Sequence, residues 1–207
     1  FIDEIRDAME QENPDSFLLG EVWEDGSNKV AYSQRRRYLL GSETHGLMNY
    51  PFRTAALDWL RGGDAACFRD TMETIREHYP RPAFYSALNI LGTHDTPRIL
   101  TLLGAEHVPG TKDARAAYRL SPEERQKGEA RLRVGEMLLY CFPGSPTVYY
   151  GDEAGMEGFE DPLNRKTYPW DRQDRALLDF FRSLGQLRRH RPSLQDGDLT
   201  YVYDLGG

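Results

Sequence analysis

The sequence has few cysteines and no long apolar run. Cys67 and Cys141 are the two cysteines among 207 residues, and this number supports neither a disulfide framework nor a cysteine-based metal site. Both lie among apolar neighbours in helix-like segments, which predicts small buried hydrophobic side chains. Residues 137–142 form one of the longest apolar runs, far short of the roughly 20 residues that a membrane-spanning helix needs. We therefore expect no membrane partner.

Positive charge is also scarce. The 26 lysines and arginines are outnumbered by 33 aspartates and glutamates, for a formal net charge of −7. Because phosphate binding is built from an excess of basic contacts, this balance argues against a nucleic-acid partner. Residues 35–37 form the one basic triplet. Acidic neighbours such as Glu24 and Glu43 favour its interpretation as a solvated face.

The first residue is Phe1 rather than methionine. We expect the chain to begin within a longer protein, with any targeting signal lost upstream, so the compartment is left open. Apolar residues make up 39% of the sequence and charged residues 29%, which is the balance of a globular protein. A chain of this length can bury about 70% of its extended surface in one or two domains.

Helix-like and strand-like patterns alternate along the chain. The helix-like segments are residues 1–12, 52–61, 64–79, 121–142 and 174–189, and the strand-like segments are residues 17–22, 47–50, 85–92 and 147–150. We expect a further helix to lead through residues 43–46 into the second strand, and residues 199–203 to begin a separate strand. Such alternation predicts an α/β fold with parallel strands joined by right-handed crossovers, either a doubly wound sheet or a barrel.

Polar residues close three of the four predicted strands. Glu21 ends the first, His94 and Asp95 end the third, and Asp152 and Glu153 end the fourth. In either parallel architecture the chemistry is expected at the carboxyl ends of the strands. The Asp152–Glu153 pair is more typical of a structural hydrogen-bonding turn than of a catalytic pair.

Two of these strand ends are candidates for catalysis. Glu21 lies two residues from Trp23, whose indole would desolvate the carboxyl, raise its pKa and prepare it as a proton donor. Taken alone, its Gly-Glu-Val run is more typical of an ordinary helix-cap or loop carboxylate. His94 and Asp95 are adjacent ionisable groups at the end of a buried strand, where they cost desolvation unless they are used. The alternative for them is an internally paired cap.

Four segments resemble signatures of the α-amylase family of glycoside hydrolases, family thirteen. Residues 17–23 (FLLGEVW) resemble its fifth-strand signature, and residues 89–98 (NILGTHDTPR) resemble the seventh. The sixth and eighth are matched by residues 48–51 (MNYP) and 144–153 (GSPTVYYGDE). Further runs, at residues 35–38, 155–158 and 161–165, are most similar to the neopullulanase and cyclomaltodextrinase branch.

This resemblance implies a fold and a reaction. The fold is the second half of a (β/α)8 TIM barrel, strands five to eight, across residues 1–195, followed by the start of a C-terminal β-sandwich domain at residues 196–207. The reaction is retaining hydrolysis of α-glucosidic bonds in starch-derived glucans or cyclodextrins. The implied partners are α-glucan oligosaccharides and the upstream half of the same barrel. No metal or other cofactor is assigned.

The resemblance also implies roles for individual residues. Glu21 matches the general acid/base, and Asp95 matches the carboxylate that stabilises the transition state. The expected substrate-binding residues are His94, Trp23, Tyr50, Asp161 and Arg165. The aromatic residues Trp23 and Tyr50, like Trp170, are equally consistent with core positions.

One expected residue is missing from the sequence. The family's nucleophile is an aspartate in a Gly-x-Arg-x-Asp-like motif at the end of the fourth strand, and the 207 residues contain no such motif. Arg69–Asp70 is the nearest imitation, but it lies within an amphipathic helical pattern. The nucleophile is therefore expected just before Phe1, and this chain by itself is predicted to be inactive.

Two alternatives to hydrolysis stay open. Within the same chemistry, the glycosyl group could be transferred to another sugar, which depends on how well the site excludes water. In another class, the chain could be a non-catalytic glucan-binding or scaffold protein that kept the barrel. Binding of maltooligosaccharides without release of reducing sugar would favour the second.

Overall fold

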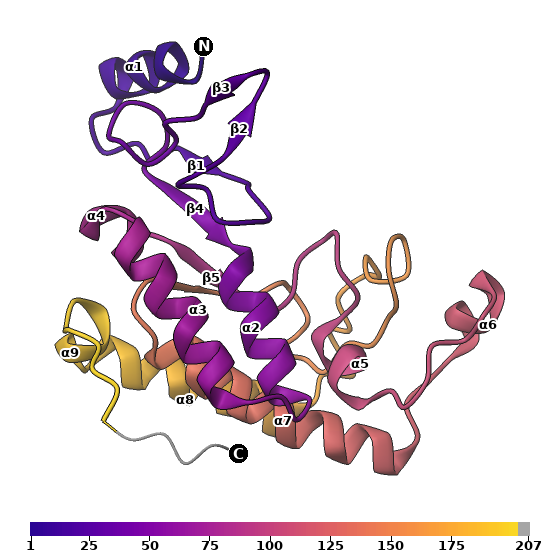
Figure 1. The fold of residues 1–207 in the computed structure, drawn as a ribbon. Coiled ribbons are helices and arrows are strands. Elements are labelled where there is room, and N and C mark those ends of the chain that lie inside the picture. The colour runs from indigo at the N-terminus through magenta and orange to yellow at the C-terminus, as the bar shows by residue number, and fades with distance from the viewer. Residues whose placement is uncertain (203–207) are drawn as a thin grey trace.

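A four-stranded parallel sheet forms the centre of the computed structural model, which describes residues 1–202 (Figure 1). Its strands are β1 (Leu19–Gly20), β4 (Gly46–Asn49), β5 (Leu88–Ile90) and β6 (Ser145–Thr147), in the order β1-β4-β5-β6. Leu19 pairs with Gly46, Met48 with Leu88, and Leu88 with Ser145. The predicted parallel α/β arrangement is therefore confirmed.

The strands are shorter than the sequence predicts. The run at 85–92 yields only three strand residues, because Pro82 favours the first turn of α4 (Arg81–Tyr85). The strand expected at 147–150 lies instead at Ser145–Thr147, since the tyrosines that follow pack beside the buried guanidinium of Arg98. Apolar character thus predicts which segments are buried. It does not predict where backbone pairing between strands stops, which depends on side-chain packing at the strand ends.

Nine helices lie within the described residues. They are α1 (Ile2–Glu12), α2 (Tyr50–Leu60), α3 (Ala65–His78), α4 (Arg81–Tyr85), α5 (Ile99–Gly104), α6 (Lys112–Ala117), α7 (Pro122–Cys141), α8 (Arg175–Arg189) and α9 (Pro192–Gln195). Four long helices begin at side-chain caps from Asn49, Asp64, Ser121 and Asp174. An oxygen at these positions accepts a backbone N–H that the helix itself cannot satisfy, which explains why the predicted starts agree with the structure to within two residues.

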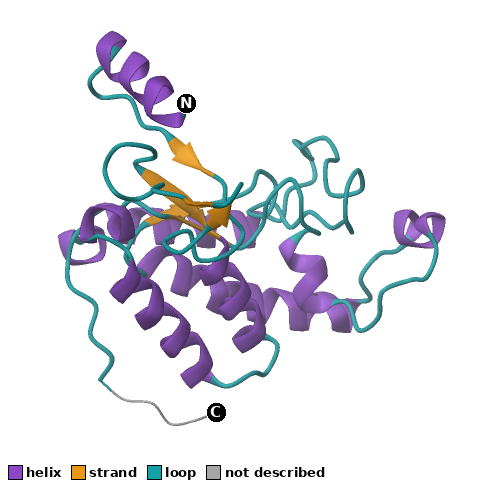
Figure 2. Ribbon diagram, turned by 45° about the horizontal axis from the view of Figure 1, so that its top comes forward, coloured by secondary structure: helices purple, strands orange, loops and turns teal. Residues whose placement is uncertain are grey.

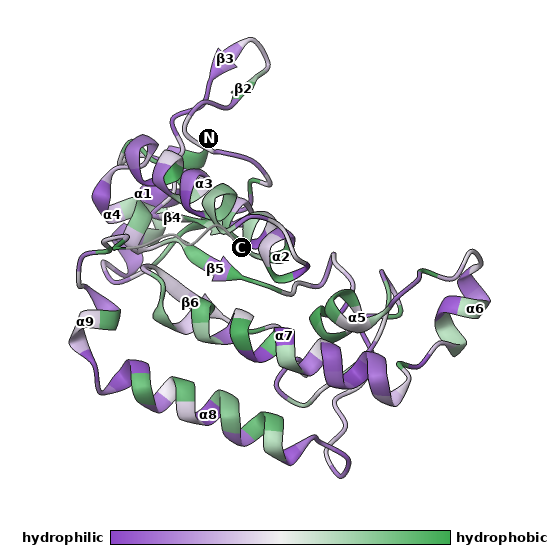
Figure 3. Cartoon of the chain, turned by 60° about the horizontal axis from the view of Figure 1, so that its bottom comes forward, coloured by the Kyte–Doolittle hydropathy of each residue, from purple (hydrophilic) through white to green (hydrophobic). Residues whose placement is uncertain are grey.

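The core lies between the sheet and the helices. Most helices lie on one side of the strands, with long loops beyond the strand ends (Figure 2). The rings of Phe52 and Phe142 have centroids 5.2 Å apart, and Phe68 lies within 5.8 Å of both. Helix α7 packs between β6 and α8 (Figure 3), and its Leu132 and Leu139 are fully buried.

Several expectations from the sequence are wrong. No helix lies between β1 and β4; the segment instead contains the antiparallel hairpin of β2 (Val30–Ala31) and β3 (Gln34–Arg35). Together with α1, this hairpin projects from the rest of the chain (Figure 1). Residues 199–202 form no strand. Leu199 instead packs against the core, and Arg76 of α3 donates a hydrogen bond to its carbonyl. The remainder of the expected strand, Tyr203, lies outside the described residues.

The two cysteines are also exposed rather than buried. Cys67 lies in α3 and Cys141 at the end of α7. Both are on outward faces, because the phenylalanines beside them in sequence, Phe68 and Phe142, take the positions that face the core. Across residues 1–202, none of the helices combines the length and apolar character needed to cross a membrane.

Candidate active site

The predicted site residues follow the carboxyl ends of the parallel strands. Glu21 comes directly after β1, and Tyr50 directly after β4. His94 and Asp95 lie in the loop after β5. Because parallel strands end at a common edge of the sheet, these side chains come from one edge, at which the barrel and doubly wound folds place their sites.

Two donors hold the carboxyl of Glu21. The Tyr50 hydroxyl donates a hydrogen bond of 2.9 Å to Oε1, and the Trp23 indole Nε1 donates one of 3.0 Å to the same oxygen. The two aromatic rings stack with centroids 4.2 Å apart and planes at 14°. The Trp23 indole does not enclose the Glu21 carboxyl as expected, because Glu21 is exposed. Trp23 instead orients the carboxyl through its hydrogen bond.

Tyr50 and Trp23 differ in exposure. Tyr50 is 1% exposed and Trp23 is 51% exposed, so Tyr50 is packed in the chain while Trp23 presents half of its surface to solvent. Burial raises the pKa of Tyr50 to about 12, and the nearby carboxylates of Glu21 and Asp95 add to the shift. The phenol therefore stays protonated at neutral pH and remains a donor to Glu21.

Asp95 lies in a cluster of acidic and basic side chains. Its Oδ2 is 3.3 Å from His94 Nε2, and its Oδ1 is 3.2 Å from Arg165 Nη2. Arg165 also contacts Asp161, with Nε 2.5 Å from Oδ1. The structure thus brings together four residues that the sequence analysis had selected. The internal pairing expected as the alternative for His94 and Asp95 forms as well, although both side chains are more than a third exposed.

The loop that carries Asp95 is held by neighbours that the sequence analysis missed. The Thr93 hydroxyl accepts a hydrogen bond of 3.2 Å from the backbone N–H of Asp95. The side-chain amide of Asn164 donates to the carbonyls of His94 and Thr96. Asn164 directly precedes the predicted ligand Arg165, but a single asparagine carries no sequence signal that it reaches a loop 70 residues away.

A buried ion pair connects the β5 loop to the segment after β6. Arg98 Nη1 lies 3.0 Å from Asp152 Oδ1, and both side chains are almost completely buried. The guanidinium carbon of Arg98 is 4.3 Å from the ring centroid of Tyr149 and 4.6 Å from that of Tyr150. Burial raises the pKa of Asp152 to about 7, against the opposing effect of Arg98. Glu153 accepts a hydrogen bond of 2.8 Å from Gly151 N–H, so the predicted structural turn is present.

A second buried carboxyl lies behind this pair. Glu136 in α7 is 2% exposed, and its Oε2 has no hydrogen-bond partner among the described residues. Burial, with the nearby carboxyls of Asp152 and Glu153, raises the pKa of Glu136 well above its ordinary value. Burial therefore favours the uncharged form of Glu136.

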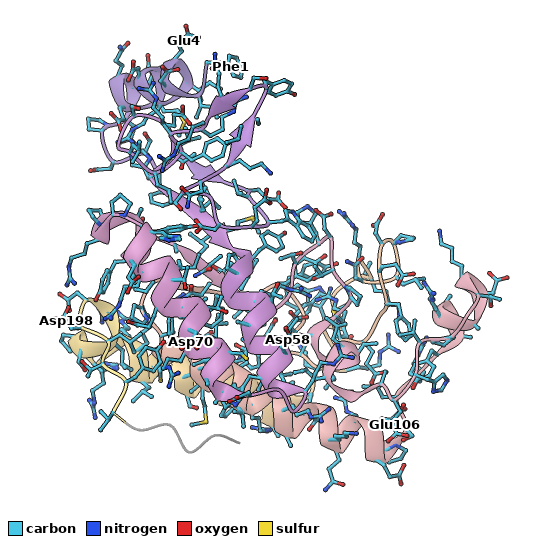
Figure 4. The ribbon with its side chains drawn as sticks, viewed as in Figure 1. Phe1, Glu4, Asp58, Asp70, Glu106 and Asp198 are labelled. Carbon is cyan, nitrogen blue, oxygen red and sulfur yellow. The ribbon has the colours of Figure 1, made fainter. Side chains whose placement is uncertain are left out.

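The Arg69–Asp70 imitation of the nucleophile motif lies far from the strand ends. It forms an exposed ion pair of 2.9 Å on α3, and Figure 4 shows Asp70 on that helix. Its helical position agrees with the structural interpretation.

The family model described as the catalytic domain of alpha-amylase matches residues 1–186. An amylopullulanase of Thermoanaerobacterium saccharolyticum is 36% identical over 96% of this chain, and the chain covers 15% of that enzyme. A cyclomaltodextrinase of Geobacillus thermopakistaniensis is 32% identical over 96% of this chain and is covered to 29%. This chain thus spans less than a third of the length of either relative.

A similar solved structure is the type III pullulan hydrolase from Thermococcus kodakarensis. It superposes with a TM-score of 0.82 at 27% identity, over 100% of this chain and 33% of that protein. Relatives named cyclomaltodextrinase and neopullulanase confirm the predicted branch resemblance. The chain belongs to the α-amylase catalytic-domain family of glycoside hydrolases.

Proposed function

We propose that this chain supplies strands five to eight of a (β/α)8 barrel and, with them, the acid/base half of a retaining α-glucosidic site. The observation that carries the proposal is the convergence of Glu21 and Asp95 on Tyr50. Tyr50 donates a hydrogen bond to Glu21 and lies close enough to Asp95 for that carboxylate to affect its pKa. Both carboxyls thus lie near the Tyr50 phenol at the strand ends.

In the proposed reaction, Glu21 protonates the glycosidic oxygen of the leaving sugar and later takes a proton from the attacking water. A retaining mechanism needs a second carboxylate about 5 Å away as nucleophile. This group would come from the upstream half of the barrel, as the family resemblance implies. Asp95 would lie opposite the positive charge that develops at the anomeric carbon, where a fixed negative charge is most effective.

The surrounding residues would bind the glucan. His94 and Arg165 offer donors to sugar hydroxyls beside Asp95, with Asp161 as the partner of Arg165. Trp23 is half-exposed and stacks on Tyr50, so its free face could carry a sugar ring. The names of the relatives favour starch-derived glucans, pullulan or cyclodextrins as substrates. Residues 1–195 would belong to the barrel and residues 196–207 would begin a C-terminal β-sandwich domain.

Replacement of the acid tests the proposal. In the enzyme containing both barrel halves, Glu21→Gln should lower kcat on maltooligosaccharides by about 10²–10⁴-fold, because the amide keeps the shape of the side chain without the proton. The limb of the pH profile that reports ionisation of this acid should also disappear. Glu24→Gln is the matched control, since Glu24 is an exposed carboxylate three residues on that pairs with Lys29. More than a tenth of the wild-type turnover in Glu21→Gln would refute the assignment.

The same assay separates the alternatives. Transfer of the glycosyl group would yield longer oligosaccharides, whereas hydrolysis would release one new reducing end for each bond cleaved. A scaffold protein would bind maltooligosaccharides and release no reducing sugar. The donor-held carboxyl of Glu21 favours a catalytic outcome over the scaffold outcome, since a protein that only binds glucans does not need it.

A further inference from the structure

The Asp95 carboxylate lies on a short irregular loop, which is held from within by Thr93 and Thr96. Residues 93–96 lie outside helices and strands. The contacts of the carboxylate itself, with His94 and Arg165, join side chains that are 40–48% exposed. Exposed ion pairs contribute little to holding a geometry, because solvent screens them and both side chains lose conformational freedom. The position of Asp95 must therefore be set mainly by buried contacts to its backbone.

Within the loop, the Thr93 hydroxyl makes one such contact with the Asp95 N–H. From outside the loop, Asn164 makes two. Its side chain is fully buried, and Nδ2 donates one hydrogen bond of 2.7 Å to the carbonyl of His94 and one of 2.8 Å to the carbonyl of Thr96. These two carbonyls flank Asp95 on either side. An amide nitrogen carries two hydrogens, so Asn164 uses its whole donor capacity on this loop.

The oxygen of the same amide has no such use. Asn164 Oδ1 is buried without a hydrogen-bond partner among the described residues, and an unsatisfied buried acceptor costs free energy. A leucine of similar size would avoid this cost. The benefit of an asparagine here therefore lies in its two donated bonds, both of which end on the Asp95 loop.

We propose that Asn164 is the positioning residue for Asp95, a step that rests on the function proposed above. Asn164 clamps the backbone on both sides of Asp95, and the next residue, Arg165, contacts the carboxylate. A side chain that stabilises the transition-state charge must be held within about 0.5 Å of its productive position. A misplacement of about 1 Å can lower the rate about 10²-fold. Loss of the clamp should therefore lower kcat far more than it raises KM.

Three variants of the enzyme containing both barrel halves test this role. Asn164→Leu removes both donors at similar volume, and kcat should fall about 10–100-fold with KM within about threefold. Asn164→Asp replaces the amide by a buried carboxyl that can donate one bond only when protonated. Its kcat relative to wild type should therefore rise as the pH is lowered, which loss of packing alone would not produce.

Thr101→Val is the matched control. Thr101 is 2% exposed, and its Oγ1 accepts a hydrogen bond of 2.9 Å from Gly158 N–H, so it anchors the same segment without contacting the Asp95 loop. This variant should lose thermal stability but keep kcat within about threefold of wild type. The proposal would be overturned if Thr101→Val lost as much kcat as Asn164→Leu, or if the kcat of Asn164→Leu stayed within threefold of wild type. It would also be overturned if the ratio of the Asn164→Asp kcat to the wild-type kcat did not change with pH.

A binding measurement separates this proposal from the proposed function. Acarbose carries a basic nitrogen near the position of the developing charge, so its affinity should fall at least tenfold in Asn164→Leu if Asp95 is displaced. The affinity for neutral maltotriose should stay within about threefold. Unchanged acarbose affinity overturns the positioning role, whereas an inactive wild-type enzyme with an intact Glu21 would overturn the proposed function instead.

Discussion

At the scale of single residues, the carboxyls of this chain fall into two environments. Glu21 and Asp95 are exposed and held by donors at the strand ends. Asp152 and Glu136 are buried, with pKa values raised by that burial. The exposed carboxyls are accessible from solvent, whereas burial couples the ionisation of the other two to the stability of the fold.

Replacement of Asp95 is the sharpest test at this scale. Asp95→Asn should lower kcat by about 10³-fold, because loss of a charge opposite a developing cation costs a few kcal/mol. His94→Asn should do less damage and should also weaken binding. The two effects should not add, since adjacent groups that hold one sugar are coupled. Steady-state kinetics of both single variants and the double variant measure this, and kcat within threefold of wild type in Asp95→Asn would contradict the assignment.

Glu136 predicts a dependence of stability on pH. Its folded pKa lies well above the ordinary value of 4.5, so its contribution to the free energy of unfolding is fully present below that value and is lost as the pH rises through the folded pKa. Glu136→Gln removes the ionisable group. The variant should match wild type near pH 4 and be more stable at pH 8 in denaturant titrations of the complete enzyme. A difference between the two proteins that is equal at both pH values would exclude this explanation.

At the scale of elements, capping side chains connect the local sequence to the position of each helix. Asn49 accepts a hydrogen bond of 3.0 Å from Phe52 N–H and so starts α2, which places Tyr50 beside Glu21. The same amide donates to Asn89 in β5 at 2.8 Å. One short polar residue thus links β4, β5 and the first turn of α2.

The start of α7 offers a measurable case. Ser121 Oγ accepts from Glu124 N–H at 3.1 Å, and Glu124 Oε2 accepts from Ser121 N–H at 2.8 Å, which forms a capping box. Ser121→Ala should lower the free energy of unfolding by about 1 kcal/mol. Ser183→Ala on the exposed face of α8 is the control and should stay within about 0.5 kcal/mol of wild type. Equal effects of the two substitutions in urea titrations would show that the cap is not the cause.

At the scale of the whole molecule, the sheet ends on two open edges. Strands β1 and β6 each have one neighbour among the described residues. Unpaired edges carry free N–H and C=O groups and invite pairing with another chain. In a closed barrel these edges would be paired by the other strands.

The isolated chain should therefore fold poorly and be inactive. Addition of a separately expressed upstream half should restore cooperative thermal unfolding and amylolysis. It would supply both the strands that pair with the open edges and the proposed nucleophile. Circular dichroism melts, sedimentation and a reducing-sugar assay, each with and without the second half, measure this. Cooperative unfolding of the isolated chain as a monomer, together with amylolysis, would be the opposite result.

Local patterns in the sequence were sufficient for much of this protein. The helical periodicity of residues 64–79 and the Ser-Pro-Glu-Glu start of α7 predict helices that the structure contains. The motifs around Glu21 and Asp95 predict the family, which the comparisons confirm. These signals are readable because capping, periodicity and strand-end motifs each act within a few residues of sequence.

Only the tertiary structure decided which distant groups meet. The bond from Tyr50 to Glu21 spans 29 residues, and the bond from Asn164 to His94 spans 70. The burial of Glu136 likewise follows from packing that no local pattern encodes. The amino-acid sequence by itself determined the family, the starts of the long helices and the candidate carboxyls. The chain's packing decided how those carboxyls are held, because hydrogen bonds and burial depend on neighbours that are remote in sequence.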